Sequence, residues 1–190
     1  MEQETKFKVR SWQVANRMML EVNAQRISER HFENNVMLDY DHNGNSFTPL
    51  RNAGQTLRIR TVPGATILTF KGPAKVVGKT KVREEVECIV HHGDNLFKIF
   101  KGLGYSPRFR YQKYRAEFAL EGAVIALDET PIGCFIEIEG TLKAITKAAK
   151  ALRLNMKDGI SDSYPKLYEQ ACKKKPALPT FMMFDEYRFH

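Results

Sequence analysis

The chain opens with Glu2-Gln3-Glu4-Thr5-Lys6-Phe7-Lys8-Val9, in which charged and apolar residues alternate. Charged side chains stand at positions 2, 4, 6 and 8, and apolar side chains stand at positions 7 and 9. Successive side chains of a β-strand point to opposite faces, so a strand here places two carboxylates and lysines on one face. An ordinary surface strand would show its charges to water in the same way. The fold is therefore decided by whether the pattern recurs.

The alternation does recur, in most of the later segments that read as strands. These segments cover residues 55–62, 66–71, 82–90, 108–118 and 134–139, with an acidic residue in 123–129. The acids on the charged faces are Glu2, Glu4, Glu85, Glu87, Asp128, Glu137 and Glu139. The bases on these faces are Lys6, Arg58, Arg60, Lys71, Arg83, Lys113 and Arg115. The opposite faces are largely apolar.

The make-up of the charged faces favours an enclosed site over a sheet face in water. A solvated face would consist mostly of lysine, glutamate and threonine. Here arginine is frequent, Glu-x-Glu pairs occur three times, and the two signs of charge nearly balance. We therefore expect an α+β protein whose antiparallel strands close into a barrel. Its charged residues would lie inside, and amphipathic helices would cover its apolar outer wall.

Four segments show helical spacing of apolar residues. Ser11 is placed to cap the first of them and Thr141 to cap the third. Asp94 begins a short second helix, and a last helix runs near residues 162–173.

Two further segments carry structural expectations. Residues 26–40 read as extended structure with a break near Asn34-Asn35. The end of the chain, residues 171–190, includes Phe181-Met182-Met183-Phe184. Because a disordered tail rarely carries so many large apolar groups, we expect this tail to pack on the rest of the fold.

Composition limits the class of protein. The length of 190 residues suits a single domain over residues 1–190, and 43% apolar with 27% charged residues is ordinary for a soluble protein. The net charge of +8 suggests an anionic partner, although lysines on solvated helix faces would give the same value. No apolar run approaches the ~20 residues needed to span a bilayer, so we expect no membrane partner.

The cysteines and the N-terminus indicate the compartment. Cys88, Cys134 and Cys172 have neither pairing nor metal-site spacing, so we expect reduced thiols. The N-terminal stretch is acidic and lacks the apolar core of a secretory signal. Both observations predict a cytoplasmic protein.

Charges inside a barrel are costly unless they pair with one another or hold ligands. Arginine and lysine match phosphate oxygens, and clustered carboxylates suit Mg²⁺, which takes oxygen ligands. Together they describe a site for a metal-bound polyphosphate. A solvated sheet face and a nucleic-acid surface are the alternatives. We expect no nucleic-acid partner, because the basic residues are not interleaved with aromatic ones and the acids would repel a phosphate backbone.

The motifs, taken in order, resemble those of the CYTH superfamily, the triphosphate tunnel metalloenzymes. That superfamily includes class IV adenylate cyclases, thiamine triphosphatases and inorganic triphosphatases. The resemblance covers residues 2 to about 170. It is carried by Glu2-x-Glu4-x-Lys6, Leu57-Arg58-Ile59-Arg60, Thr69-Phe70-Lys71-Gly72-Pro73, Arg83-Glu84-Glu85-Val86-Glu87, Lys113-Tyr114-Arg115, Leu127-Asp128-Glu129 and Phe135-Ile136-Glu137-Ile138-Glu139.

The resemblance implies an eight-stranded antiparallel tunnel with helices outside and Mg²⁺ or Mn²⁺ as cofactor. It implies that the triphosphate is bound by Lys6, Arg58, Arg60, Lys71, Arg83, Lys113 and Arg115. It implies metal binding by Glu2, Glu4, Glu85, Glu87, Asp128, Glu137 and Glu139. Glu2, Glu4 and Lys6 are the implied catalytic residues.

Three functions remain open at this stage. The first is a metal-dependent triphosphatase acting on tripolyphosphate, ATP or thiamine triphosphate, as a monomer or homodimer. The second is a class IV adenylate cyclase that converts ATP to cyclic AMP and pyrophosphate. The third is a binding module without turnover. We favour hydrolysis slightly, because a cyclase also needs a base pocket that the sequence does not reveal.

Overall fold

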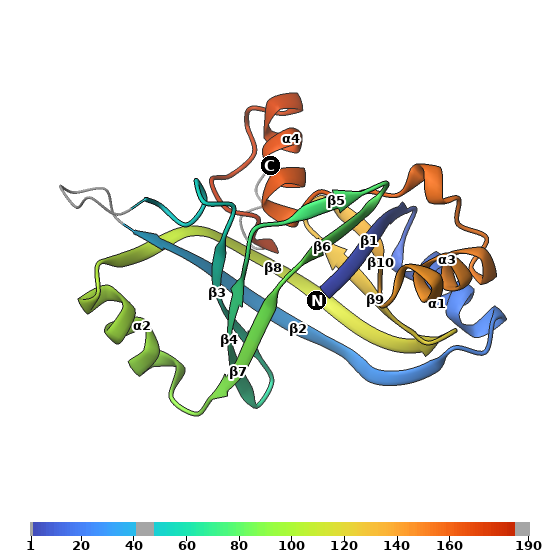
Figure 1. Ribbon diagram of the computed structural model, residues 1–190, viewed down its shortest axis with the longest axis horizontal. Helices are drawn as coiled ribbons and strands as arrows, with labels where there is room; N and C mark the ends of the chain where they lie inside the picture. The colour runs from blue at the N-terminus through green and yellow to red at the C-terminus, as the bar shows by residue number, and fades with distance from the viewer. Residues whose placement is uncertain (1, 41–47, 185–190) are drawn as a thin grey trace.

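A ten-stranded antiparallel sheet and four α-helices make up the described part of the chain, residues 2–40 and 48–184 of a computed structural model (Figure 1). The strands are β1 (Glu2–Val9), β2 (Gln25–Tyr40), β3 (Thr56–Val62), β4 (Ala65–Lys71), β5 (Lys75–Val77), β6 (Thr80–Arg83), β7 (Glu85–Val90), β8 (Tyr105–Leu120), β9 (Ala123–Thr130) and β10 (Gly133–Glu139). The helices are α1 (Trp12–Glu21), α2 (Gly93–Gly102), α3 (Leu142–Ala151), α4 (Tyr164–Lys174) and the 3-10 turn η1 (Met156–Asp158). The α+β class is confirmed.

The sheet is open, with the strand order β5-β6-β1-β10-β9-β8-β2-β3-β4-β7. The predicted closed barrel of eight strands is not confirmed, because the described sheet has ten strands and its ends are not paired into a ring. The physical reason lies at Glu84. On one side of this residue β6 pairs with β1, and on the other side β7 pairs with β4. The chain thus changes partner where a closed barrel would need one continuous strand.

The main apolar core lies between the sheet and helices α1 and α3, which Figure 1 shows together at one end of the molecule. Phe7, Ile136 and Ile138 contribute from the apolar parity of β1 and β10. Both predicted caps are present: the Ser11 hydroxyl accepts a hydrogen bond from the Val14 amide, and Thr141 caps α3 in the same way. This packing fixes the opposite, charged parity toward the other side of the sheet.

Helix α4 departs from the prediction that all helices lie outside the charged space. Its Tyr164 and Tyr168 pack against Phe135 and Tyr111. Phe135 shares the parity of Glu137, so α4 covers the charged face of the sheet. Aromatic residues interspersed among the charged ones give this helix an apolar surface on which to pack.

Strand β2 runs without interruption for 16 residues, so the predicted break at Asn34-Asn35 is wrong. Asn34 and Asn35 both pair with β3 on one side and β8 on the other. Tertiary pairing here outweighs the low strand propensity of asparagine.

The described part of the C-terminal tail contacts β8. Met182 is fully buried, its amide donates a hydrogen bond to the Arg110 carbonyl, and its carbonyl accepts one from the Gln112 amide. Residues 185–190 of the tail lie outside the described residues. That residues 1–190 form one domain stays a prediction. Among the described helices, we find none with the length and apolar character to cross a membrane.

Candidate functional site

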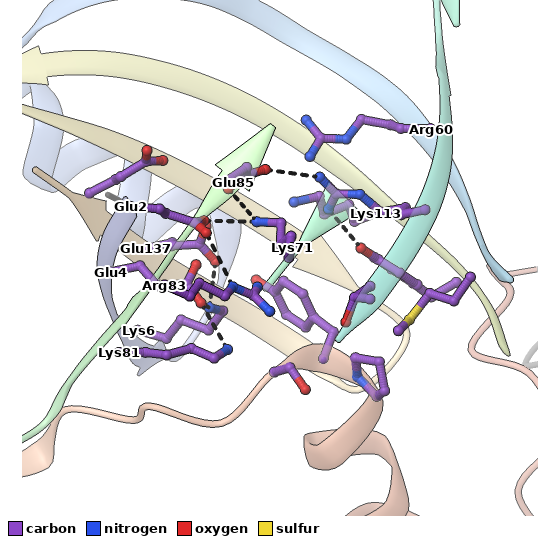
Figure 2. Close-up of a pocket in the computed structure, with 18 of the residues that line it drawn as sticks. Glu2, Glu4, Lys6, Arg60, Lys71, Lys81, Arg83, Glu85, Lys113 and Glu137 are labelled. Atoms are coloured by element: carbon purple, nitrogen blue, oxygen red, sulfur yellow. Dashed lines mark hydrogen bonds and ion pairs between the residues drawn. The ribbon is translucent and has the colours of Figure 1, made fainter. Parts of the chain in front are cut away.

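The charged faces of the strands line a cavity of about 560 Å³ (Figure 2). Thirteen of the fourteen residues predicted for the site line it: Glu2, Glu4, Lys6, Arg58, Arg60, Lys71, Arg83, Glu85, Glu87, Lys113, Arg115, Glu137 and Glu139. They come from seven strands spread along the whole chain. The alternation in the sequence therefore brings these groups together, as predicted, while their individual roles stay predictions.

Lys71 lies between two carboxylates. Its ammonium donates to Glu2 at 2.8 Å and to Glu85 at 2.7 Å, and Arg83 also donates to Glu2 at 3.2 Å (Figure 2). Burial and a hydrogen bond with Glu2 raise the pKa of Glu85 to about 8. Burial opposes ionisation of Glu2, but the hydrogen bond with Glu85 and the charge of Lys71 lower its pKa to about 2. At neutral pH the two carboxyl groups therefore share one proton.

Lys6 forms a second buried ion-pair group on the floor of the cavity. Its ammonium lies 2.8 Å from Glu137 and 3.1 Å from Glu4. Burial disfavours the charged lysine, but the two carboxylates outweigh this effect and raise the pKa of Lys6. Lys81 also donates to Glu4, at 3.1 Å. Burial and the neighbouring cations lower the pKa of Lys81, although Glu4 acts in the opposite direction.

Asp128 is the predicted site residue that does not line the cavity. Arg115 donates to both of its oxygens at 2.7 Å, and Lys113 and the Tyr164 hydroxyl donate to Oδ2 at 3.1 and 2.6 Å. The carboxylate is 1% exposed. In this arrangement Asp128 positions Lys113 and Arg115 from behind instead of facing a ligand.

Arg58 and Arg60 lie on β3 and reach the cavity from the wall opposite β1. Arg58 donates to the Tyr111 hydroxyl at 3.2 Å and to Glu87 at 3.3 Å. Arg60 lies 3.7 Å from the buried carboxylate of Glu33. The Nε atoms of both arginines have no hydrogen-bond partner among the described residues. The contacts of Arg60 with Glu33 and Glu87, at 3.7 and 3.9 Å, are longer than hydrogen bonds, so its terminal N–H groups keep donor capacity for an anion.

Besides the lining residues Met37, Thr56, Glu117, Ser163 and Pro165, four residues that touch or support the site were missing from the predicted set. They are Glu33, Lys81, Tyr111 and Tyr164. Lys81 has the same parity as Arg83, and Tyr111 has the same parity as Lys113, so the alternation already contained a signal for both. Glu33 was not predicted as a site residue because a break in the strand was expected next to it. Nothing in the sequence pattern places Tyr164 of α4 at the cavity.

The metal ligands that the cavity offers are mainly carboxylate oxygens. Burial and the charges of Glu2 and Glu137 raise the pKa of Glu139, which indicates carboxylates that repel one another. Across residues 2–40 and 48–184, no three acidic, histidine or cysteine side chains meet at one candidate metal position. Mg²⁺ commonly takes one or two carboxylates, with phosphate and water as its other ligands. Carboxylate oxygens of this kind suit Mg²⁺ or Mn²⁺, and Glu139 with Glu137 or Glu2 would hold such an ion.

The fold and the site define a protein whose antiparallel β-sheet surrounds a cavity lined by charged side chains. The chain belongs to the CYTH family. The CYTH domain matches residues 1–164. A Methanocaldococcus jannaschii protein named "putative adenylate cyclase" is 31% identical over 103 residues, which are 54% of this chain and 58% of that protein. The match thus spans little more than half the length of that relative.

Solved structures share the fold. The PH1819 protein of Pyrococcus horikoshii superposes with a TM-score of 0.74 at 25% identity, covering 90% of this chain and 99% of that one. A Hippeastrum protein, described as a "putative adenylyl cyclase" with a dominant triphosphatase activity, superposes with a TM-score of 0.67 at 16% identity, covering 90% and 96%.

Proposed function

We propose that this protein is a divalent-metal-dependent triphosphatase that hydrolyses a phosphoanhydride bond of an inorganic or organic triphosphate in the charged cavity. The observation that carries the proposal is the cavity wall itself, where arginines and lysines from separate strands surround a space also lined by carboxylates. CYTH membership supports the substrate class.

The charge of the wall supports a joint requirement for substrate and metal. Among the described lining residues, eight are basic and seven are acidic, so the two signs of charge largely cancel. A triphosphate brings several negative charges into this space. Because buried charge is costly unless it is compensated, the anion is best accommodated together with divalent cations.

The side chains of the wall would act mainly by positioning. Arg58, Arg60, Lys71, Lys113 and Arg115 would hold the phosphate chain, with Asp128 fixing the last two. Mg²⁺ or Mn²⁺, when bound, would neutralise charge on phosphate and carboxylate oxygens. Glu2 or Glu4 would orient a water molecule in line with the terminal phosphorus. The low pKa of Glu2 makes it a weak base, so orientation suits it better than proton removal.

A class IV adenylate cyclase remains the second candidate, because the name of the M. jannaschii relative favours it. The dominant triphosphatase activity of the Hippeastrum protein favours hydrolysis. A binding module without turnover would be favoured by loss of a cavity carboxylate. All six predicted glutamates are in place. A cytoplasmic location and a monomeric or homodimeric state belong to the same proposal.

The deciding experiment incubates the protein with tripolyphosphate, thiamine triphosphate and ATP, each with Mg²⁺ and with Mn²⁺. Orthophosphate, pyrophosphate and cyclic AMP are measured separately. Orthophosphate from tripolyphosphate is the expected result. Cyclic AMP and pyrophosphate in equal yield from ATP, with tripolyphosphate unchanged, would replace the proposal by the cyclase. Binding without any product would support the binding module.

A further inference from the structure

A second cavity, of about 830 Å³, lies on the other face of the sheet between α2 and strands β2 and β8. The alternation of β2 explains why the two cavities are separate. Met37 contributes to the charged cavity, whereas Asn34, Val36 and Leu38 contribute to the second one. The two cavities share no lining residue. The sheet is thus a common wall between two unlike spaces.

The walls of the second cavity are mainly apolar. The cavity exists because α2 does not pack closely onto the sheet. Phe97 and Phe100 of α2 face Val36 and Leu38 of β2, yet no residue of α2 is fully buried. Figure 1 shows α2 at the end of the molecule away from α1 and α3. Protein interiors are close-packed, and cavities of this size with apolar walls are typical of small-molecule sites.

One buried polar atom points to a ligand with a hydrogen-bond donor. The Oδ1 atom of Asn34 is buried and has no hydrogen-bond partner in the described structure. Buried acceptors are nearly always satisfied, and an unsatisfied one carries a desolvation cost. If the Asn34 amide rotates toward the cavity, an N–H or O–H group on a bound molecule would remove that cost.

Two cations at the cavity indicate that the ligand is an anion. Lys101 of α2 and Arg110 of β8 both line the cavity and are exposed. Arg110 lies directly opposite Val36 in the β2–β8 register, which puts its side chain on the same face. Neither cation forms an ion pair with an acid of the described chain, so no neighbouring acid neutralises its charge. The Arg110 guanidinium does lie over the Phe181 ring, 5.9 Å from the ring centroid.

We propose that this cavity binds a small amphipathic organic anion. Its apolar body would lie between Val36 and the rings of Phe97 and Phe100. Its acidic group would contact Lys101 and Arg110, and an N–H or O–H group would donate to Asn34. This site is independent of the charged cavity and of the reaction proposed there.

The probe for the test is 1-anilinonaphthalene-8-sulfonate, which has an aromatic body, a sulfonate and an N–H donor. It is titrated into the folded full chain and followed by fluorescence and calorimetry. We expect one saturable site per chain. Saturating tripolyphosphate with Mg²⁺ should leave the affinity unchanged, because the cavities share no residue.

Charge reversal on α2 provides a matched pair of variants. Lys101→Glu should weaken probe binding by roughly fivefold or more, since it replaces an attractive contact by a repulsive one. Lys98→Glu makes the same change in net charge on the same helix, but Lys98 does not line the cavity, so its affinity should stay within about twofold of wild type. Equal losses in both variants would overturn the proposal, as would displacement by tripolyphosphate or binding without saturation.

Asn34→Leu supplies a second test. It removes the unsatisfied acceptor, so the melting temperature of the unliganded protein should rise while the probe binds more weakly. Unchanged probe affinity in a folded Asn34→Leu protein would contradict the assigned hydrogen bond.

Discussion

Lys71 on β4 and Glu2 on β1 form a 2.8 Å ion pair, although their strands lie near opposite ends of the sheet order. This contact bridges the curved sheet where backbone pairing does not. The Gly72 amide also donates to the Glu84 carbonyl beside it. One lysine therefore both links β4 to β1 and stands in the wall of the charged cavity.

Replacing Lys71 by methionine should weaken the binding of any triphosphate, whatever organic group it carries. A charge-assisted contact contributes about 1.5–3 kcal/mol, so the dissociation constant should rise roughly tenfold to a hundredfold. Calorimetry with tripolyphosphate and with ATP measures the effect. Lys75→Met, on the exposed strand β5, is the control and should bind normally. A change in the preference between the two ligands at unchanged overall affinity would show that Lys71 recognises the organic group.

Glu139→Gln should lower turnover by orders of magnitude while substrate still binds. The change keeps the shape of the side chain but removes a charge from the carboxylate group that fits the metal. Steady-state rates with Mg²⁺, together with the dissociation constant, separate the two effects. Glu29→Gln changes an exposed acid far from the cavity wall and should leave rates unaltered. Near-normal activity of Glu139→Gln would remove this carboxylate from the mechanism.

Asp128→Asn should destabilise the fold, because it leaves the buried cations Lys113 and Arg115 without their shared partner. Breaking a buried ion pair typically costs about 3–5 kcal/mol. The neighbouring Glu129 pairs with Arg30 at the surface, and exposed pairs contribute about 1 kcal/mol or less. Denaturant unfolding of Asp128→Asn and Glu129→Gln measures both. Equal stabilities would show that Asp128 does not hold the two bases.

The free energy of unfolding should fall as the pH rises from mildly acidic to alkaline values, because His31 loses its positive charge over this range. The Glu33 carboxylate, 3.7 Å from the Nε2 atom of His31, raises the pKa of His31 above its ordinary value, and partial burial acts in the opposite direction. Glu117 also favours the charged form. A raised folded-state pKa stabilises the fold below the unfolded value of about 6.5, and this contribution is lost as the pH rises through the folded-state pKa. Melting curves of wild type and His31→Gln from roughly pH 5 to pH 9 should converge at the alkaline end. A constant difference would contradict this role.

The period-two alternation predicted the charged face well because it depends only on local backbone geometry. Lys6 and Glu137 share a face in any register that buries Phe7 and Ile136. Sheet closure could not be predicted in the same way. It depends on the change of partner at Glu84, which is a tertiary choice between β1 and β4.

The sequence pattern also could not predict whether a residue lines the cavity or lies behind its wall. Asp128 has the correct parity, but it pairs across β8–β9 with Arg115, whose guanidinium covers it. Tyr164 reaches the cavity because α4 packs on Phe135, a contact between segments distant in sequence. Parity selects a face of the sheet, whereas the order of side chains on that face requires the packed structure.

Tripolyphosphate with Mg²⁺ should raise the melting temperature of the protein. A ligand that binds only the folded state stabilises it by mass action. At a concentration of about a hundred times the dissociation constant, the gain is about 2.7 kcal/mol. For a chain of this size that corresponds to a shift of roughly 5 to 10 °C. The shift should shrink in Lys71→Met and persist in Lys75→Met, which ties it to the cavity wall and not to the overall positive charge. Thermal scans at rising tripolyphosphate that show no shift in wild type would count against a triphosphate site in this cavity.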